Sequence, residues 1–377
     1  MRTVTYYEFF AGGGMASLGF GPGAECLFAN DDNEMKCDSY RSNFSDHELR
    51  EVDITKLLPS DVPGIADVAW ASPPCQDVSA AGRGAGLSGA RSCLAFAFVR
   101  LMAGLAAEGR APRMIVIENV ERLVRLSDGK DLASLVDQIS ALGYRVGAVV
   151  IDAALFVPQS RRRLFIVAVR ADLHVPGHLV AGEPQSNWHT SGFKRVVAGL
   201  SAQAQEHWIW WKLPQPAPRT STLADVVHAN REGVAWDSIA DTERLLQSMS
   251  ARNQSKIAAA QANGTLEVGT LARRTREAIV RAEVRFNGVS GCLVTPKGGA
   301  SYPRLIAVDG PSIRSRLLSS REAARLMGLP DRYELPESFG DAMRLIGDGV
   351  VVPVVAHITR HLIVPLVSAA EAVGLAA

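Results

Sequence analysis

Cysteine is scarce in this chain of 377 residues. Its five cysteines are an odd number at irregular spacing: Cys26, Cys37, Cys75, Cys93 and Cys292. This pattern argues against a disulfide framework and predicts a reduced, cytosolic compartment. The sequence also lacks a Cys-x-x-Cys pair or a His/Cys cluster, so we predict no metal site.

Long apolar runs are missing as well. No run approaches the roughly 18 residues that span a bilayer, so we predict no membrane segment. Hydrophobic residues nevertheless make up 47% of the chain and charged residues 21%, the balance of a protein that buries a core. At roughly 150 residues per domain, the length predicts two or three structural units.

A net charge of only +1 conceals a segregation of charge along the chain. Residues 1–70 hold 5 Lys or Arg against 12 Asp or Glu, whereas residues 244–304 hold 10 against 3. The second region therefore has a net charge of +7, which favours a polyanionic partner for that region alone. A solvated basic face is the alternative interpretation.

Strand-like apolar runs alternate with helical spacing over the first 170 residues. The runs are 3–10, 26–31, 67–72, 114–118, 146–152 and 164–169, and the helical stretches are 15–19, 92–107 and 131–142. Apolar strands separated by helices predict a parallel sheet covered on both faces. Only about ten residues separate the last two runs, too few for a helical crossover, so these two strands should pair antiparallel. An α/β fold with one antiparallel strand is typical of the class I methyltransferases.

The composition of the sequence changes near Ser186, and the regular alternation of strands and helices is lost. Five of the six tryptophans fall between Trp188 and Trp236, and a basic stretch containing Gln, Asn and Ser follows. We interpret these tryptophans as the core of a small second domain, with a stacking platform for bases as the alternative.

The predicted organisation has three parts. A catalytic domain occupies 1–185, a second domain 186–311, and a C-terminal segment at 312–377 returns to the first domain. Near its start, this segment predicts a helix capped by Ser319 or Ser320. Further on, Pro353 argues against a central strand.

A glycine-rich turn follows the first predicted strand. Phe10 and Ala11 lead into three glycines, Gly12 to Gly14. Glycines let the backbone approach a ligand, and the helix that follows presents free amides. About 20 residues further on, Asp31 or Asp32 ends the next strand, a position that suits a ribose hydroxyl pair. The turn predicts a nucleoside cofactor; a plain tight turn is the alternative.

Two further strands end in residues that can do chemistry. Cys75 follows two prolines that could hold a thiol in a fixed direction, at a strand end where ligands bind. A buried structural cysteine is the alternative. Glu118 ends an apolar run, and desolvation there should raise the pKa of its carboxyl toward a value useful for proton donation. A helix-capping acid is the alternative.

Arginines gather at two places. Arg161, Arg162 and Arg163 precede the last predicted strand, and alternation would put Arg161 and Arg163 on one side. Two guanidinium groups there could hold a phosphate or a carbonyl oxygen, while a solvated turn is the alternative. We interpret the second run as phosphate contacts, with a solvated face as the alternative. It comprises Arg273, Arg274, Arg276, Arg281 and Arg285.

Six motifs in this order resemble those of the bacterial cytosine carbon-5 DNA methyltransferases. They are FAGGG (10–14), PPCQ (73–76), ENV (118–120), PQSRRR (158–163), REAARLMGLP (321–330) and GDGVVVPV (347–354). The resemblance covers nearly the whole chain apart from roughly 186–285. It implies methyl transfer from S-adenosylmethionine to carbon 5 of a cytosine flipped out of double-stranded DNA.

The resemblance also implies a role for each motif. Cys75 matches the nucleophile that adds to carbon 6, Glu118 the carboxylate that grips the base, and Arg161 and Arg163 the arginines beside that pocket. The implied cofactor contacts are Phe10, Ala11, Gly12, Gly13, Asp31 at the ribose, Asp32, Asp53 at the adenine amino group, Ile54, Pro74, Leu94, Asp348 and Gly349. The predicted DNA contacts are Gln76, Ser79, Arg273, Arg274 and Arg276.

Two positions depart from the family pattern. Asp348 stands where the family usually has Asn, which adds a negative charge near a cationic cofactor. Phe156 and Val157 precede the PQ dipeptide without the glycine that is usual there. Both departures bear on fine geometry and leave the reacting groups in place.

Three other functions compete with this reading. A tRNA cytosine methyltransferase shares the fold and much of the motif set, but a second domain of about 125 residues with an arginine run favours DNA. A catalytically silent DNA-binding protein is opposed by the presence of Cys75, Glu118, Arg161 and Arg163. A nicotinamide oxidoreductase is opposed by the glycine spacing and the antiparallel strand. We predict a cytoplasmic, nucleoid-associated monomer, with a restriction endonuclease as a separate companion.

Overall fold

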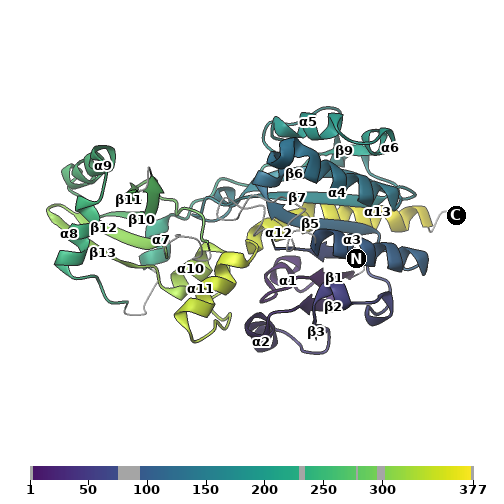
Figure 1. Ribbon diagram of the computed structural model, residues 1–377, viewed down its shortest axis with the longest axis horizontal. Helices are drawn as coiled ribbons and strands as arrows, with labels where there is room; N and C mark the ends of the chain where they lie inside the picture. The colour runs from purple at the N-terminus through teal and green to yellow at the C-terminus, as the bar shows by residue number, and fades with distance from the viewer. Residues whose placement is uncertain (1–2, 75–93, 229–233, 277–278, 295–301, 375–377) are drawn as a thin grey trace. The chain divides into compact units, whose positions relative to one another are not determined.

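A computed structural model describes residues 3–74, 94–228, 234–276, 279–294 and 302–374 (Figure 1). By internal contacts the chain forms two compact units. Unit 1 comprises Met1–Ile151, Arg162–Pro216 and Val350–Ala377, and unit 2 comprises Asp152–Arg161 and Ala217–Gly349.

Unit 1 is built on a nine-stranded sheet of order β3-β2-β1-β4-β5-β7-β6-β9-β8. In that order the strands are Leu49–Glu51, Ala24–Asp31, Val4–Phe9, Val68–Ala71, Met114–Val120, Arg162–Arg170, Tyr144–Asp152, Trp208–Trp211 and Val180–Ala181. The first five run parallel to their neighbours. Strand β7 pairs antiparallel with β5 and also neighbours β6. The predicted α/β fold, a mostly parallel sheet with an antiparallel strand after a short connection, is confirmed.

Helices cover both faces of this sheet. The α-helices of unit 1 are α1 (Met15–Phe20), α2 (Glu34–Asn43), α3 (Leu94–Ala107), α4 (Lys130–Ala141), α5 (Gly192–Ala198), α6 (Ala202–Glu206), α12 (Val352–Ile358) and α13 (Val364–Gly374). Helices α3 and α4 share one apolar core with alternate residues of the central strands. Helices α1 and α12 pack together, with Gly19 so close to Val355 that an added Cβ would lie 2.3 Å from the valine Cβ. Figure 1 shows α4 in front of the sheet and α13 behind it.

By length and composition, one stretch, Phe339–Ala370, is apolar enough to cross a membrane. Residues 349–351 interrupt its helices, and 61% of its most apolar window is buried inside the protein. Burial of this extent is what a core helix requires. Pro353 lies in the first turn of α12, so the prediction that it excludes a central strand is confirmed.

The tryptophans complete the sheet of unit 1, and the prediction that they form the core of a second domain is wrong. Residues 208–211 are strand β9, which pairs parallel with β6 and antiparallel with β8. Trp188 and Trp211 are fully buried, and the Trp211 Nε1 donates to the Val167 carbonyl at 3.0 Å. Only Trp236 belongs to unit 2, where it is partly exposed. Short strands at a sheet edge supply the burial that large indoles need.

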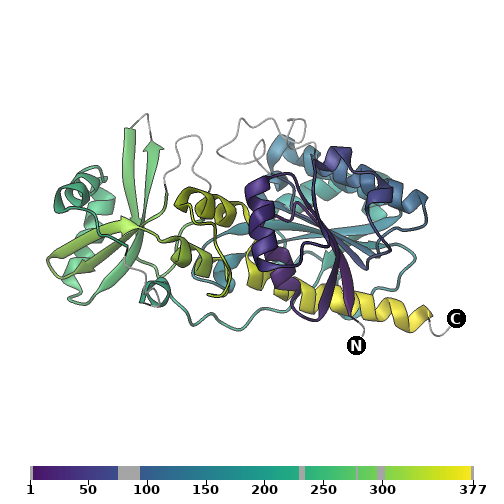
Figure 2. The same ribbon diagram turned by 90° about the horizontal axis from the view of Figure 1, so that it is seen from below.

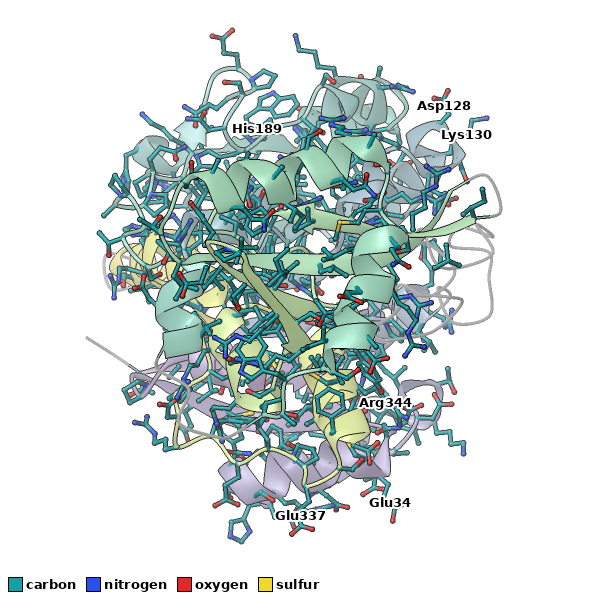
Figure 3. All side chains as sticks on the ribbon, turned by 90° about the vertical axis from the view of Figure 1, so that its left-hand side faces the viewer. Glu34, Asp128, Lys130, His189, Glu337 and Arg344 are labelled. Carbon is teal, nitrogen blue, oxygen red and sulfur yellow. The ribbon has the colours of Figure 1, made fainter. Side chains whose placement is uncertain are left out.

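Unit 2 contains a four-stranded antiparallel sheet of order β11-β10-β12-β13. Its strands are β10 (Glu267–Arg276), β11 (Ile279–Arg285), β12 (Arg304–Asp309) and β13 (Ser312–Leu317), and its α-helices are α7 (Leu223–His228), α8 (Ile239–Gln247), α9 (Ala251–Ala262), α10 (Ser320–Leu326) and α11 (Phe339–Asp348). Helices α8 and α9 pack on one face of the sheet and close a small apolar core (Figure 3). Figure 2 shows β10 and β11 as a long hairpin.

The helix predicted over 319–326 is confirmed. The Ser319 hydroxyl accepts from the Glu322 amide at 3.0 Å, and the Glu322 carboxylate accepts from the Ser319 amide at 2.8 Å. This reciprocal capping box fixes the start of α10.

The two units divide the chain at other positions than the predicted domains. Unit 2 begins at Ala217 and ends at Gly349, whereas 186–311 was expected. It also takes in the connection between β6 and β7, Asp152–Arg161. The REAARLMGLP helix therefore belongs to unit 2, and the chain returns to unit 1 only at Val350.

Candidate active site

Five predicted site positions lie at the carboxyl ends of five adjacent parallel strands. In sheet order they are Asp53 after β3, Asp31 at the end of β2, Phe10 after β1, Pro74 after β4 and Glu118 near the end of β5. Parallel strands bring their carboxyl ends to the same sheet edge, where open α/β sheets bind ligands. The sheet order thus gathers motifs that lie far apart in the sequence.

The glycine turn after β1 has an unusual backbone. Phe10, Gly12 and Gly14 have φ angles of 57°, 56° and 74°. Positive φ is costly for a bulky residue such as phenylalanine and is concentrated at functional sites. At Gly14, a Cβ would lie 2.3 Å from the Phe44 ring, so only glycine fits. The turn is held tightly between β1 and α1.

The Asp31 carboxylate is tied to this turn. Its Oδ2 accepts from the Gly12 amide at 2.8 Å, and its Oδ1 accepts from the Asn33 amide at 3.0 Å. Burial raises the pKa of Asp31, against the opposing effects of the Lys36 charge and these two amides. Asp32, the other predicted ribose partner, is exposed. The acid at the end of β2 is therefore hydrogen-bonded directly to the glycine turn.

Sequence reasoning missed a buried acid beneath the turn. The Glu8 carboxylate accepts from the Ser17 hydroxyl and from the backbone amides of Ala16 and Ser17 at the start of α1. Burial raises the pKa of Glu8 to about 7. Helix α1 begins at Gly14 without a side-chain cap, so Glu8 supplies its N-terminal acceptors from the strand below. An acid inside an otherwise apolar strand was the available signal.

The Glu8 contact also bears on the nicotinamide alternative. A dinucleotide site places pyrophosphate against the amides at the N-terminus of the helix after β1. Here two of those amides already face a carboxylate. The arrangement disfavours a phosphate at this place.

Three further predicted cofactor residues lie around the same edge. Asp53 caps a short 3-10 helix, η1 (Ile54–Lys56), where its Oδ1 accepts from the Thr55 amide at 2.8 Å. This amide lowers the pKa of Asp53. Ile54 is buried in the main core, and Leu94, the first residue of α3, packs against that core.

Glu118 and Arg163 form an ion pair beside the proline loop. The Arg163 Nε lies 3.1 Å from the Glu118 Oε1, and both side chains are largely buried. Because β7 runs antiparallel to β5, the start of β7 lies beside the end of β5. The Asn119 side-chain Nδ2 donates to the Pro73 carbonyl at 3.5 Å, which links the end of β5 to the loop that leads to Cys75. Cys75 itself, Gln76 and Ser79 lie outside the described residues.

Strand alternation was expected to put Arg161 on the same side as Arg163. Strand β7 begins at Arg162, so alternation does not extend to Arg161. The Arg161 guanidinium is buried within unit 2, where it donates to backbone carbonyls. Arg162 forms a bidentate ion pair with Glu121, in which Nε donates to Oε2 at 2.7 Å and Nη2 donates to Oε1 at 3.1 Å.

The remaining predicted residues belong to unit 2. Asp348 is exposed at the end of α11, and Gly349 follows it as the C-cap. On β10, Arg273 lies opposite the buried Ala282, whereas Arg274 lies opposite Arg281. Successive strand residues face opposite ways, so Arg273 and Arg274 present different faces. Among the described residues, no cluster of three or more His, Cys, Asp or Glu side chains could hold a metal ion.

A mostly parallel sheet with the antiparallel strand β7 and a site at its carboxyl edge defines a class I methyltransferase. Comparison with known families narrows the class. The model of the C-5 cytosine-specific DNA methylases matches residues 4–364, and the chain belongs to this family. It is an enzyme that uses S-adenosylmethionine to methylate carbon 5 of cytosine in DNA.

Individual relatives agree. The chain is 24% identical over 359 residues to the Type II methyltransferase M.NlaX of Neisseria lactamica, covering 94% of this chain and 95% of the relative. It is 35% identical over 221 residues to M1.HphI of Haemophilus parahaemolyticus, covering 54% and 57%.

Among solved structures, the fold is similar to that of the S. pombe Dnmt2 methyltransferase, with a TM-score of 0.56 and 16% identity over 95% of this chain and 97% of that one. The Entamoeba histolytica methyltransferase EhMeth has a TM-score of 0.60 and 15% identity, over 96% and 98%. At this identity the likeness concerns the fold.

Proposed function

We propose that Cys75, Glu118 and Arg163 form the catalytic centre of this methyltransferase. The observation that carries the proposal is the buried Glu118–Arg163 ion pair, which lies next to the loop that leads to Cys75. Carbon 5 of cytosine is a poor nucleophile, so electrons must first be pushed into the ring. Addition of the Cys75 thiolate to carbon 6 does this.

Glu118 and Arg163 hold and polarise the base. The Glu118 carboxyl, protonated or sharing a proton, would donate to N3 of the cytosine and accept from its amino group, which offsets the negative charge that develops at N3 as the thiolate adds. Arg163 keeps one Glu118 oxygen in place and supplies a cation at the base pocket. After methyl transfer, carbon 5 gives its proton to a water molecule, and the electron pair re-forms the double bond between carbons 5 and 6, which breaks the bond to sulfur and releases Cys75 as a thiolate. A base stacked in the duplex exposes neither carbon 6 to the thiolate nor its N3 edge to Glu118, so the cytosine has to be flipped out.

We propose a cofactor site along the same sheet edge. The proposed cofactor residues are Phe10, Ala11, Gly12, Gly13, Asp31, Asp32, Asp53, Ile54, Pro74, Leu94, Asp348 and Gly349. S-adenosylmethionine, when bound, supplies an electrophilic methyl on a sulfonium cation. The acids at the ends of β2 and β3 suit a cationic nucleoside, and we assign Asp31 to the ribose and Asp53 to the adenine amino group.

Unit 2 is the proposed target-recognition unit. The net charge of +7 over 244–304 supports contact with the phosphates of double-stranded DNA. Gln76, Ser79, Arg274 and Arg276 remain the proposed DNA contacts, whereas Arg273 faces the opposite side of β10 from Arg274. By strand alternation and register, Arg274, Arg281 and Arg285 share one face of the β10–β11 hairpin. Of the two faces, this arginine-rich one is the better candidate for contact with the DNA phosphates.

The setting of the enzyme is also a proposal. The relatives are named Type II methyltransferases, which supports a companion restriction endonuclease that acts separately. One active site per chain suits a monomer that works in the cytoplasm, on nucleoid DNA.

Bisulfite sequencing of a plasmid from cells that express the chain tests the function. We expect protected cytosines at one recurring sequence, and none with Cys75→Ser. Purified enzyme is then offered duplex DNA carrying that sequence and transfer RNA in parallel. Methylation of the RNA alone would contradict DNA as the substrate. Protected cytosines in cells that express Cys75→Ser would contradict the covalent mechanism.

A further inference from the structure

The first four residues of the PQSRRR motif, 158–161, join distant segments of unit 2. Gln159 is fully buried; its Nε2 donates to the Leu326 carbonyl at 2.8 Å, and its Oε1 accepts from the Leu293 amide at 3.1 Å. Ser160 and Pro158 exchange backbone hydrogen bonds with Ser290, at 2.9 and 2.8 Å. A motif expected beside the base thus joins three distant segments of one unit.

Arg161 extends this junction to the end of α11. Its Nη1 donates to the Leu293 carbonyl at 2.8 Å, and its Nη2 donates to the carbonyls of Gly347 at 3.0 Å and Gly349 at 2.7 Å. The side chain is buried, with 3% of the residue exposed. Hydrogen bonds from an ionised donor are stronger than neutral ones, and the planar guanidinium fixes the positions of its acceptors.

The two glycine carbonyls flank Asp348. Because both are held by the same nitrogen, the Gly347–Asp348 and Gly349–Val350 peptide groups on either side of Asp348 are fixed while its side chain stays exposed. We propose that Arg161 is a positioning residue for the cofactor: it sets Asp348 and Gly349, and does not contact the base. This inference rests on the proposed cofactor role of Asp348 and Gly349.

Arg161→Lys is the test variant and Arg162→Lys its matched control. Lysine keeps the charge but offers one compact ammonium, which cannot span carbonyls on two segments in the same way. Arg162 is the next residue, and its guanidinium is partly exposed beside Glu121. For Arg161→Lys we expect the KM for S-adenosylmethionine to rise about ten-fold, the size of one lost hydrogen bond to a charged group, with kcat and the KM for DNA little changed. Arg162→Lys should match the wild type.

A double-variant cycle with Asp348→Ala identifies the route of the effect. If Arg161 acts through Asp348, the fold-increase in KM for S-adenosylmethionine in the double variant should be smaller than the product of the fold-increases in the two single variants. Independent, multiplying effects would overturn the inference while leaving the cofactor role of Asp348 intact. A rise in the KM for DNA with an unchanged KM for the cofactor would place Arg161 at the DNA.

Failure of the underlying proposal has a different signature. If Asp348→Ala alone leaves the KM for S-adenosylmethionine unchanged, Asp348 is no cofactor contact and the inference falls with it. If Arg161→Lys has a clearly lower Tm than the wild type, its kinetics do not test the inference. Hydrogen exchange of the wild type then tests whether Arg161 and the Asp348 segment respond together to the cofactor product. S-adenosylhomocysteine should then slow exchange at 345–350 and at 158–162 together, and slowing at 345–350 alone would overturn the coupling.

Discussion

Glu8 shows how one buried carboxylate can organise a cofactor turn. It receives two backbone amides and one hydroxyl at the start of α1, a place where most helices use a capping side chain of their own. The Tyr6 hydroxyl in turn donates to the Ser17 hydroxyl at 2.8 Å. The network joins strand β1 to helix α1 on either side of the glycine turn.

This burial predicts a pH-dependent stability. The pKa of Glu8 is raised from 4.5 to about 7, so the folded state binds a proton that the unfolded state has released. The stabilisation is full below pH 4.5 and is lost as the pH rises through about 7. Relative to the wild type, Glu8→Gln should therefore gain stability as the pH rises from 5 to 7, by at most about 1.4 kcal/mol per pH unit.

Urea denaturation at pH 5, 6, 7 and 8 measures this difference. Glu25→Gln, an exposed glutamate on the next strand, is the control and should show a constant difference from the wild type. An equally constant difference for Glu8→Gln would mean that Glu8 does not titrate in this range.

The proposed nucleophile gives a sharper chemical prediction. Cys75→Ser should lower kcat by about 10³-fold or more, as loss of other catalytic nucleophiles does, while DNA binding persists. DNA carrying 5-fluorocytosine should trap a covalent adduct with the wild type, because fluorine stands where the departing proton would be. Denaturing gels after incubation with cofactor detect it. Cys93→Ser should still form the adduct, and trapping by Cys75→Ser would point to another nucleophile.

At the scale of elements, strand order explains how candidate residues far apart in the sequence reach one sheet edge. Strands β2, β1, β4 and β5 were recognisable as apolar runs, and they are adjacent and parallel; β3 was not, because it is short and two of its three residues are exposed. The strand ends were therefore predictable, and so was the edge at which they meet. Arg161 was not predictable in this way, because it lies one residue before β7 and its partners are carbonyls 132 to 188 positions away. Contacts to backbone atoms leave no pattern in side-chain types.

The β10–β11 hairpin carries a prediction of its own. Arg274 lies directly opposite Arg281, and its Nε also lies 3.4 Å from the Oε2 of Glu283, an acid on the same face of the hairpin. If that face binds phosphates, Arg274→Ala should weaken binding to cognate and random duplexes alike. It should also lower the slope of log affinity against log salt by about 0.9.

Arg273→Ala is the matched variant, since the neighbouring residue lies on the other face of the same strand. Fluorescence anisotropy between low and moderate salt should show an unchanged slope for it. A lowered slope for Arg273→Ala alone would place the DNA against the opposite face. A loss restricted to the cognate duplex would instead make Arg274 a base-reading residue.

At the scale of the whole chain, composition misplaced the boundary between the units. The cluster of tryptophans from Trp188 marked a change in sequence texture, but it did not mark a change of core. Four of these residues pack at the far edge of the first sheet, where short strands need large side chains to bury enough area. The boundary follows from which core each segment joins, and local composition does not contain that information.

Trp211 tests this assignment. It is fully buried, its Nε1 donates to Val167 on β7, and a Cβ on Gly147 of β6 would lie 2.6 Å from that nitrogen. Trp211→Ala should therefore cost about 3–5 kcal/mol of the free energy of unfolding, and the loss should be felt in unit 1. Trp236→Ala is the comparison. That indole is partly exposed under Arg314, whose guanidinium carbon lies 4.6 Å from the ring centre, so its loss should cost about 0.5–1 kcal/mol.

Native-state hydrogen exchange locates the damage. Trp211→Ala should speed exchange in β6 and β7 and leave β10 and β12 protected, because local openings follow the contacts of each cooperative region. The predicted second-domain core would require the reverse, with β10 and β12 losing protection first. The two outcomes separate a tryptophan cluster that completes the catalytic sheet from one that stabilises the target-recognition unit.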